Sequence, residues 1–165
     1  MIDASVADAL MTTALDEARA AVEHRDVPIG AVVARLADGE ILARRHNERE
    51  RLGDPTAHAE VLALRDASAA LGSWRLDGCV LVCTLEPCPM CAGACVAARV
   101  PVVVFGAADP KAGAFGSLYH LGADPRLNHE VAVVHGIRAD ESAALLREFF
   151  AGHRNPAGSD GTPTP

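Results

Sequence analysis

Two short segments carry residue types that could do chemistry together: HAE at 58–60 and PCPMC at 87–91. Cys88 and Cys91 are three residues apart, so one helical turn would direct both sulfurs to the same side. A helix N-terminus favours thiolates, because its unpaired N–H groups carry partial positive charge. Together with His58 they make three ligands of the kinds that zinc prefers. A structural zinc site takes four protein ligands, so three leave a position for water and predict a catalytic zinc.

Glu60 is the candidate for moving protons. Zinc lowers the pKa of a bound water to near neutrality, but removal of an amine also needs a group that takes the proton of this water and delivers protons to the ring nitrogen and the departing amine. Glu60 is two residues from a predicted ligand and has no competing role. Positions two apart on an ideal helix point to different sides, so we expect His58 to lie in a frayed first turn.

Each motif is ambiguous when it is taken alone. An HxE triplet is most often a surface polar pair, and a CxxC occurs in redox sites, structural zinc sites and catalytic zinc sites. A structural site usually has a second CxxC, which this sequence lacks, and a redox site needs a thioredoxin-like context that the order of elements only half supplies. H-x-E followed by P-C-x-x-C, each at the start of a predicted helix, is the pattern of zinc deaminases.

The elements that must position these residues alternate between helices and strands. Hydrophobic periodicity and turn residues predict the following order: a helix over 6–24, strands over 29–34 and 41–47, a helix from 54 to 71, a strand over 79–84, a helix from 89 to 99, a strand over 100–105, a short helix after 117, a strand over 131–134 and a helix over 140–150. The alternation predicts an α/β fold, a three-layer α/β/α sandwich with a central five-stranded sheet, and a hairpin turn at Asp38-Gly39 makes that sheet mixed. Strand-to-helix junctions gather at one edge of such a sheet, where these folds place their sites.

Composition indicates a single reduced domain. The chain has 165 residues, and 50% of them are hydrophobic, so a core can form without disulfides. Five cysteines are an odd number, and we expect Cys79, Cys83 and Cys95 to be core residues. We expect Trp74 to be a packing residue rather than one that stacks on a base. We expect the domain to cover 1–154 and the Gly-, Pro-, Ser- and Thr-rich tail, 155–165, to be disordered.

Charge and hydropathy limit the partners and the location. The formal net charge is -7, so any contact with nucleic acid must use a local basic patch. Four arginines at 44, 45, 49 and 51 cluster around Asn47, although Glu48 and Glu50 interrupt them and a solvated charged loop is the simplest interpretation. No apolar run reaches the ~18 residues of a membrane span, and the acidic start does not resemble a signal peptide. We therefore expect a cytoplasmic protein.

The sequence resembles the cytidine-deaminase superfamily and, more closely, the bacterial tRNA-specific adenosine deaminases, over about residues 8–154. The resemblance rests on VPIGAVV (27–33), HNE (46–48), DPTAHAEVLALR (54–65), TLEPCPMCAGA (84–94), DPKAGAFGSL (109–118), LNH (127–129) and the FF of the last helix. It implies a cytidine deaminase-like fold, a zinc ion, a homodimer, and conversion of adenosine to inosine at the wobble position of a tRNA anticodon stem-loop. In that reaction water attacks C6 while Glu60 protonates N1 and then passes a proton to the leaving ammonia.

The resemblance also implies contacts with the substrate. Asn47 should hydrogen-bond the target base, which should lie in a pocket lined by Pro28, Ile29 and Ala59. A second set should lie near the path of the RNA: Asp109, Lys111, Ser117, Asn128 and His129. Each of these residues also has an ordinary explanation, as the end of a strand, the start of a core strand or a polar surface position. Glu130, where a basic residue is expected, and a last helix with few arginines depart from the family.

Two other functions stay open on these grounds. A deaminase of free bases or nucleosides, such as guanine or cytosine, would use the same metal site, so only the pocket and its rim distinguish it. A non-catalytic zinc- or RNA-binding module is the other alternative, and the presence of Glu60 argues against it. The helix that follows Cys88 is apolar on most of its sides, which favours burial of part of it in a homodimer.

Overall fold

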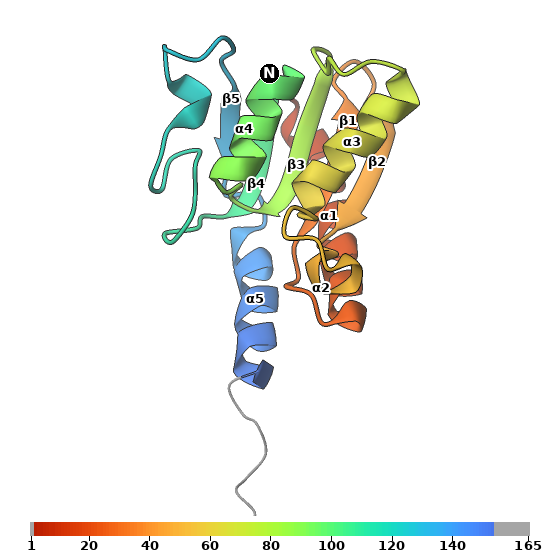
Figure 1. Cartoon of the computed structure of the whole chain (residues 1–165), viewed down its shortest axis with the longest axis vertical. Coiled ribbons are helices and arrows are strands. Elements are labelled where there is room, and N and C mark those ends of the chain that lie inside the picture. The colour runs from red at the N-terminus through yellow and green to blue at the C-terminus, as the bar shows by residue number, and fades with distance from the viewer. Residues whose placement is uncertain (1, 154–165) are drawn as a thin grey trace, which may run out of the picture.

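The computed structural model describes residues 2–153, so the predicted disordered tail at 155–165 lies outside the described residues. A single five-stranded sheet, in the order β2-β1-β3-β4-β5, forms the centre of the molecule (Figure 1). Its strands are β1 (Gly30–Arg35), β2 (Ile41–His46), β3 (Cys79–Leu85), β4 (Val102–Ala107) and β5 (Ala132–His135). β1 pairs antiparallel with both β2 and β3, whereas β3, β4 and β5 run parallel. The predicted mixed sheet is confirmed.

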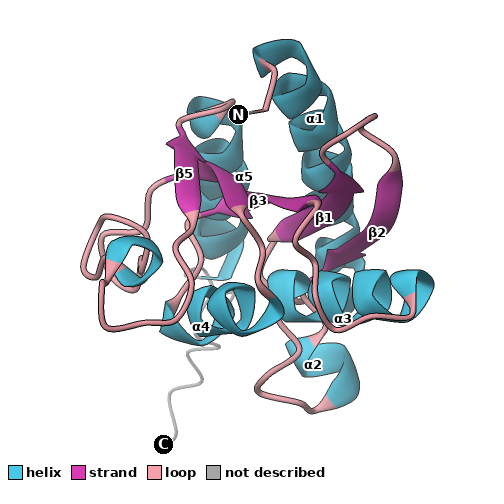
Figure 2. Ribbon diagram, turned by 90° about the horizontal axis from the view of Figure 1, so that it is seen from above, coloured by secondary structure: helices cyan, strands magenta, loops and turns pink. Residues whose placement is uncertain are grey.

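Helices cover both faces of this sheet. They are α1 (Ala4–Ala21), α2 (Arg49–Leu52), α3 (Ala59–Leu71), α4 (Pro89–Ala98) and α5 (Ala139–His153), with 3₁₀ turns η1 (Val22–His24) and η2 (Leu121–Ala123). Figure 2 shows α1 and α5 on one side of the sheet and α3 and α4 on the other, which confirms the three-layer architecture. Within residues 2–153, no helix has the length and hydrophobicity to cross a bilayer.

The two faces of the sheet have separate cores. In β3, Cys79, Leu81 and Cys83 pack in the core toward α3 and α4, whereas Val80 and Val82 pack toward α1. The strand reads as an uninterrupted apolar run because both of its faces are buried. The cysteines expected in the core are buried there, Cys95 included, and all five cysteines of the chain are free.

A close contact fixes α1 on the sheet. A Cβ added to Gly30 would lie 1.9 Å from the carbonyl oxygen of Ala14 and 2.6 Å from the nitrogen of Ala18. Only glycine therefore allows the start of β1 to touch the backbone of α1. This contact sets the depth at which β1, and the loop that leads into it, lie in the molecule.

Several predicted boundaries are wrong for identifiable reasons. The helix expected from 54 begins at Ala59, because the Asp54 carboxylate accepts hydrogen bonds from the backbone N–H and the hydroxyl of Thr56 and holds a turn there. α2, which was not predicted, precedes that turn. β4 begins two residues later than expected, after Pro101, and the helix expected after 117 is only the turn η2.

Trp74 does not pack inside. Its side chain is 59% exposed at the surface, and the guanidinium carbon of Arg75 lies 5.2 Å from the centroid of its ring. A large exposed apolar side chain indicates a contact surface when other apolar side chains surround it.

Candidate active site

The predicted zinc ligands lie at the starts of two helices on the same face of the sheet. His58 is the residue that precedes α3, with φ −75° and ψ 146°, and Cys88 precedes α4, with φ −71° and ψ 171°. Pro89 at the first helical position of α4 suits this start, because it lacks the N–H that would be unpaired there. His58 therefore lies in extended backbone just before the helix, not in its frayed first turn. Because His58 lies outside the helix and Glu60 lies inside it, the two side chains are not held to opposite sides of one helix, as expected.

The three donor atoms fit a zinc ion. The Nδ1 of His58 lies 3.8 Å from the Sγ of Cys88 and 3.5 Å from the Sγ of Cys91, and the two sulfurs are 3.6 Å apart. Tetrahedral zinc with Zn–S bonds of ~2.3 Å and Zn–N bonds of ~2.05 Å separates two sulfurs by about 3.8 Å, and a sulfur from a nitrogen by about 3.6 Å. Among the described residues, this is the group of His, Cys, Asp and Glu side chains that could hold a metal ion.

The charges of the ligands are coupled. The hydrogen bond with Cys91 lowers the pKa of Cys88 to about 3 against the effect of burial, and the imidazole of His58 acts in the same direction. The hydrogen bond with Cys88, together with burial, raises the pKa of the Cys91 thiol. The hydrogen bond with Cys88 likewise raises the pKa of His58. Cys88 is therefore the ligand that is most easily held as a thiolate, as expected at the start of a helix.

Glu60 is buried in the first turn of α3, with 3% of its surface exposed. Its Oε2 has no hydrogen-bond partner, and burial raises the pKa of the carboxyl. A buried polar atom without a partner is rare in a folded protein and calls for an explanation. Beside three metal ligands, a carboxyl with a raised pKa can accept a proton from water and give it back to a substrate.

Asn47 connects the end of β2 to the start of α3. It is buried, its Oδ1 accepts the backbone N–H of Ala59 at 2.9 Å, and its own N–H donates to the carbonyl of Ile29 at 3.0 Å. The structure thus brings Ile29, Asn47 and Ala59 together next to His58. Pro28 is buried directly before them. A contact of these residues with a base stays a prediction.

The residues expected near the RNA fall into two groups. Asp109, Lys111 and Ser117 belong to a segment that contacts the residues directly before Cys88. Asn128 and His129 lie elsewhere: the Oδ1 of Asn128 accepts from Arg99 at 2.7 Å, and the Nε2 of His129 lies 2.8 Å from the carbonyl of Val100. These partners follow the far end of α4, a helix of 10 residues, which places them about 15 Å from its first turn.

The arginines near Asn47 do not form a free basic patch. Arg49 is exposed and has no ion pair within the described chain. The other three pair with acids: Arg44 with Glu17 at 3.5 Å, Arg45 with Asp66 at 2.6 Å, and Arg51 with Glu48 at 2.7 Å.

Sequence reasoning assigned no role to Glu86. It lies between β3 and Cys88, only 2% of its surface is exposed, and its carboxylate accepts hydrogen bonds from the loop that follows β4. Burial pushes its pKa up, but the hydrogen bonds, with those from Ser117 the strongest, hold it below the usual value. An acid directly after a strand that is buried along almost its whole length was the signal that could have revealed it.

Residues 4–107 match the family model of the cytidine and deoxycytidylate deaminase zinc-binding region. The chain belongs to this family of zinc-dependent deaminases. It is 51% identical, over 140 residues, to the tRNA-specific adenosine deaminase of Bacillus subtilis, which covers 85% of this chain and 86% of that protein. A solved tRNA:A34 deaminase, described as editing A to I at the wobble position of transfer RNA, superposes with a TM-score of 0.79 at 45% identity, over 83% of this chain and 98% of the other.

A more distant neighbour has a different substrate. The guanine deaminase of Nitrosomonas europaea superposes with a TM-score of 0.74 at 31% identity, over 87% of this chain and 84% of that protein. The shared fold therefore does not by itself decide which base a protein of this fold deaminates.

The geometry gives each residue of this deaminase a role. His58, Cys88 and Cys91 would hold the zinc ion of this family, which would supply an activated water when bound. The buried carboxyl of Glu60 lies in the first turn of α3, two residues after His58, and is the candidate for carrying protons where bulk solvent has little access. Asn47 holds the N-terminus of α3, and with it the backbone from which His58 and Glu60 project.

Proposed function

We propose that this deaminase converts adenosine to inosine at the wobble position of a tRNA anticodon. The observation that carries the proposal is the ligand triad with the buried carboxyl of Glu60 nearby, whose Oε2 has no hydrogen-bond partner. The substrate follows from the relatives, since identity is 51% and 45% to two tRNA adenosine deaminases but 31% to the guanine deaminase.

In this reaction adenosine and water give inosine and ammonia. Glu60 takes one proton from the attacking water and delivers it to N1 of the adenine ring as the water oxygen adds to C6. Glu60 then moves the remaining proton of the added hydroxyl to the amine, and the bond from C6 to the amine breaks to release ammonia. Asn47 hydrogen-bonds the base through the part of its amide that Ala59 does not use. Pro28 and Ala59, which are buried, and Ile29, which is partly buried, line the base pocket, and their low exposure supports a site with little access for bulk water.

We place the RNA strand along the carboxyl edge of the parallel strands. Asp109, Lys111 and Ser117 would contact nucleotides beside the target. Asn128 and His129 are too far from the zinc ligands to touch the reacting base in the same chain, so they would contact nucleotides farther along the RNA. Binding energy from these flanking contacts orients the base for reaction, and a free adenosine lacks it. The enzyme would act in the cytoplasm, with its tRNA.

A homodimer is part of this proposal. The outer surfaces of α3 and α4 form a shallow apolar hollow of about 500 Å³ that includes Val61, Leu64, Ala97 and the exposed Trp74. A second copy would cover this hollow, which we call the α3–α4 face.

The test compares an anticodon stem-loop that carries adenosine at the wobble position with guanine, cytosine, adenine and their nucleosides. We expect inosine in the RNA and poor turnover of every free base, measured by digestion and chromatography. Rapid turnover of guanine, with no inosine in the RNA, would favour the second candidate, a guanine deaminase, and would leave the assignment of the metal site unchanged.

A further inference from the structure

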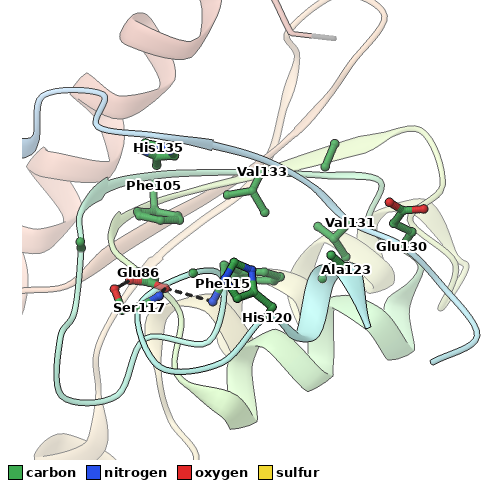
Figure 3. A pocket seen from close by; sticks show the side chains of 14 residues that line it. Glu86, Phe105, Phe115, Ser117, His120, Ala123, Glu130, Val131, Val133 and His135 are labelled. Carbon is green, nitrogen blue, oxygen red and sulfur yellow. Dashed lines mark hydrogen bonds between the residues drawn. The ribbon is translucent and has the colours of Figure 1, made fainter. Parts of the chain in front are cut away.

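The Glu86 side chain does not point at the metal ligands, although only Pro87 separates it from Cys88. Its backbone N–H donates to the carbonyl of Ala107 at 2.9 Å, so the residue still belongs to the ladder between β3 and β4. Figure 3 shows the carboxylate turned toward Ser117 and the loop after β4. We call residues 109–117 of that loop the 109–117 segment.

Loop donors surround this carboxylate. Oε2 accepts the N–H of Asp109 at 3.0 Å and the hydroxyl of Ser117, while Oε1 accepts the N–H groups of Phe115 and Ser117, both at 3.0 Å. A carboxylate has about four lone-pair sites, and all of them are used here. Within residues 2–153 the carboxylate has no cationic partner, so the 109–117 segment alone satisfies this buried charge.

Gly113 makes the arrangement sterically possible. A Cβ added there would lie 2.3 Å from the carboxyl carbon and from Oε2 of Glu86. A free glutamate could swing away from such a methyl group, but this one is held by four hydrogen bonds. The segment is also joined to the ligand-bearing part of the chain by a bond of 2.9 Å from the N–H of Ala114 to the carbonyl of Pro87.

Core packing holds the middle of the segment, where Ala114 and Phe115 are buried. A cavity of about 580 Å³ lies behind the segment, bordered by Phe105, Phe115, Val133 and His135, with Glu86 and Ser117 at its wall (Figure 3). The hydrogen bonds to Glu86 add to this core contact and extend to both ends of the segment, Asp109 and Ser117.

We propose that Glu86 is a positioning residue that fixes the 109–117 segment beside the zinc ligands, and that it thereby sets the affinity for the nucleotides next to the target without taking part in the chemistry. The role in RNA affinity rests on the proposed function. A segment that is already ordered does not lose conformational entropy when the substrate binds, so its contacts give more net affinity. Asp109 and Lys111 lie on this segment, and Lys111 is exposed.

The requirement is for a carboxylate and not for any polar group. In Glu86→Gln one of the two oxygens becomes an NH₂ group. In the Oε1 position this group would face two backbone N–H donors, and in the Oε2 position it would face the N–H of Asp109 and the Ser117 hydroxyl, which can also accept. At least one backbone N–H therefore loses its acceptor whichever way the amide is turned. A hydrogen bond to a charged group changes an equilibrium constant by roughly tenfold to a hundredfold. We therefore expect amide hydrogen exchange at 109, 115 and 117 to accelerate at least ~10-fold in this variant.

The kinetic test uses the zinc-loaded full chain and the anticodon stem-loop. For Glu86→Gln we expect KM to rise about 10-fold or more, kcat to stay within about threefold of wild type, and zinc content to remain near one per chain. Glu23→Gln, at an exposed position in η1, is the matched control and should change neither constant. If Glu86→Gln does not fold, Ser117→Ala, which removes only the hydroxyl bond, should give a smaller change in the same direction.

A double-mutant cycle tests the contact itself. Gly113→Ala should raise KM in the wild-type background, but it should have little further effect in Glu86→Ala, where the carboxylate no longer occupies the space. Additive effects of Gly113→Ala and Glu86→Ala on KM would overturn the proposal. Unchanged hydrogen exchange and KM in Glu86→Gln would also overturn it, as would a loss of kcat in Glu86→Gln with KM unchanged. A wild-type enzyme that acts only on a free base would refute the RNA function alone, and hydrogen exchange would still decide whether Glu86 holds the segment.

Discussion

Replacement of Glu60 by glutamine separates proton transfer from metal binding more cleanly than any other change in this site. The side chain keeps its size, and the zinc ligands are untouched. Glu60 is 3% exposed and its Oε2 has no protein partner, so bulk water cannot easily take over the transfer of protons to N1 and to the leaving amine.

The burial of Glu60 determines how much of the deamination rate the Glu60→Gln variant should lose. A general acid–base group contributes about 10²–10⁴-fold, which corresponds to about 3–5 kcal/mol of transition-state stabilisation. Because solvent has little access, we expect the upper part of that range. The free energy of unfolding of Glu60→Gln should increase although its activity falls. An unsatisfied buried polar atom costs about 1–3 kcal/mol, and a neutral amide is less costly to bury than a carboxylate. A gain of about 1 kcal/mol would raise Tm by about 2–4 °C in a chain of this size.

Three measurements on one preparation test this reasoning: single-turnover deamination of the stem-loop, zinc content by elemental analysis, and thermal unfolding. Glu60→Gln should lose turnover, keep about one zinc per chain and unfold no earlier than wild type. Glu23→Gln serves as the exposed control. Turnover within a few-fold of wild type would remove Glu60 from the mechanism, and loss of zinc would show that its role is to support the ligands.

The remaining predictions concern the metal, the core, the oligomer and the RNA. Cys88→Ala should lose most of its zinc, whereas Cys83→Ala, in the core of the same sheet, should retain it; full zinc occupancy of the first variant would contradict the ligand assignment. Gly30→Ala, which forces a methyl into the backbone of α1, should destabilise the fold by about 3 kcal/mol in urea unfolding, while Gly78→Ala, with no atom within 4 Å of the added methyl, should change it little. Ala97→Glu on the α3–α4 face should convert a dimer to a monomer by light scattering, and a monomeric wild type would reject the interface. Each neutralised phosphate contributes about 0.7 to the slope of log affinity against log salt concentration on a single strand. Because the net charge is -7, we expect a total slope below about 3 for the stem-loop. A steeper slope would show that the protein binds the RNA with a larger basic surface.

The sequence by itself determined the metal ligands and the class of chemistry. Zinc requires particular atoms, and spacing along the chain is enough to show that Cys88 and Cys91 face the same way once a helix begins at Pro89. Strands were also predictable, because β3 and β4 are buried on both faces and so read as continuous apolar runs. The ligand spacing and the apolar strands depend on residues that are close together in the sequence, so they can be recognised without the tertiary structure.

Only the tertiary structure decided what depends on partners that are distant in the sequence. The first N–H of α3, at Ala59, donates to Asn47, which lies twelve positions earlier in the chain. The buried charge of Glu86 is satisfied by donors 23 to 31 positions away. Arg44 and Arg45 pair with acids on α1 and α3. Asn128 lies far from the metal because it binds Arg99 at the opposite end of α4. The residue types in the sequence do not identify these distant partners. Burial, hydrogen bonds and ion pairs of this kind arise only when separate elements pack against one another.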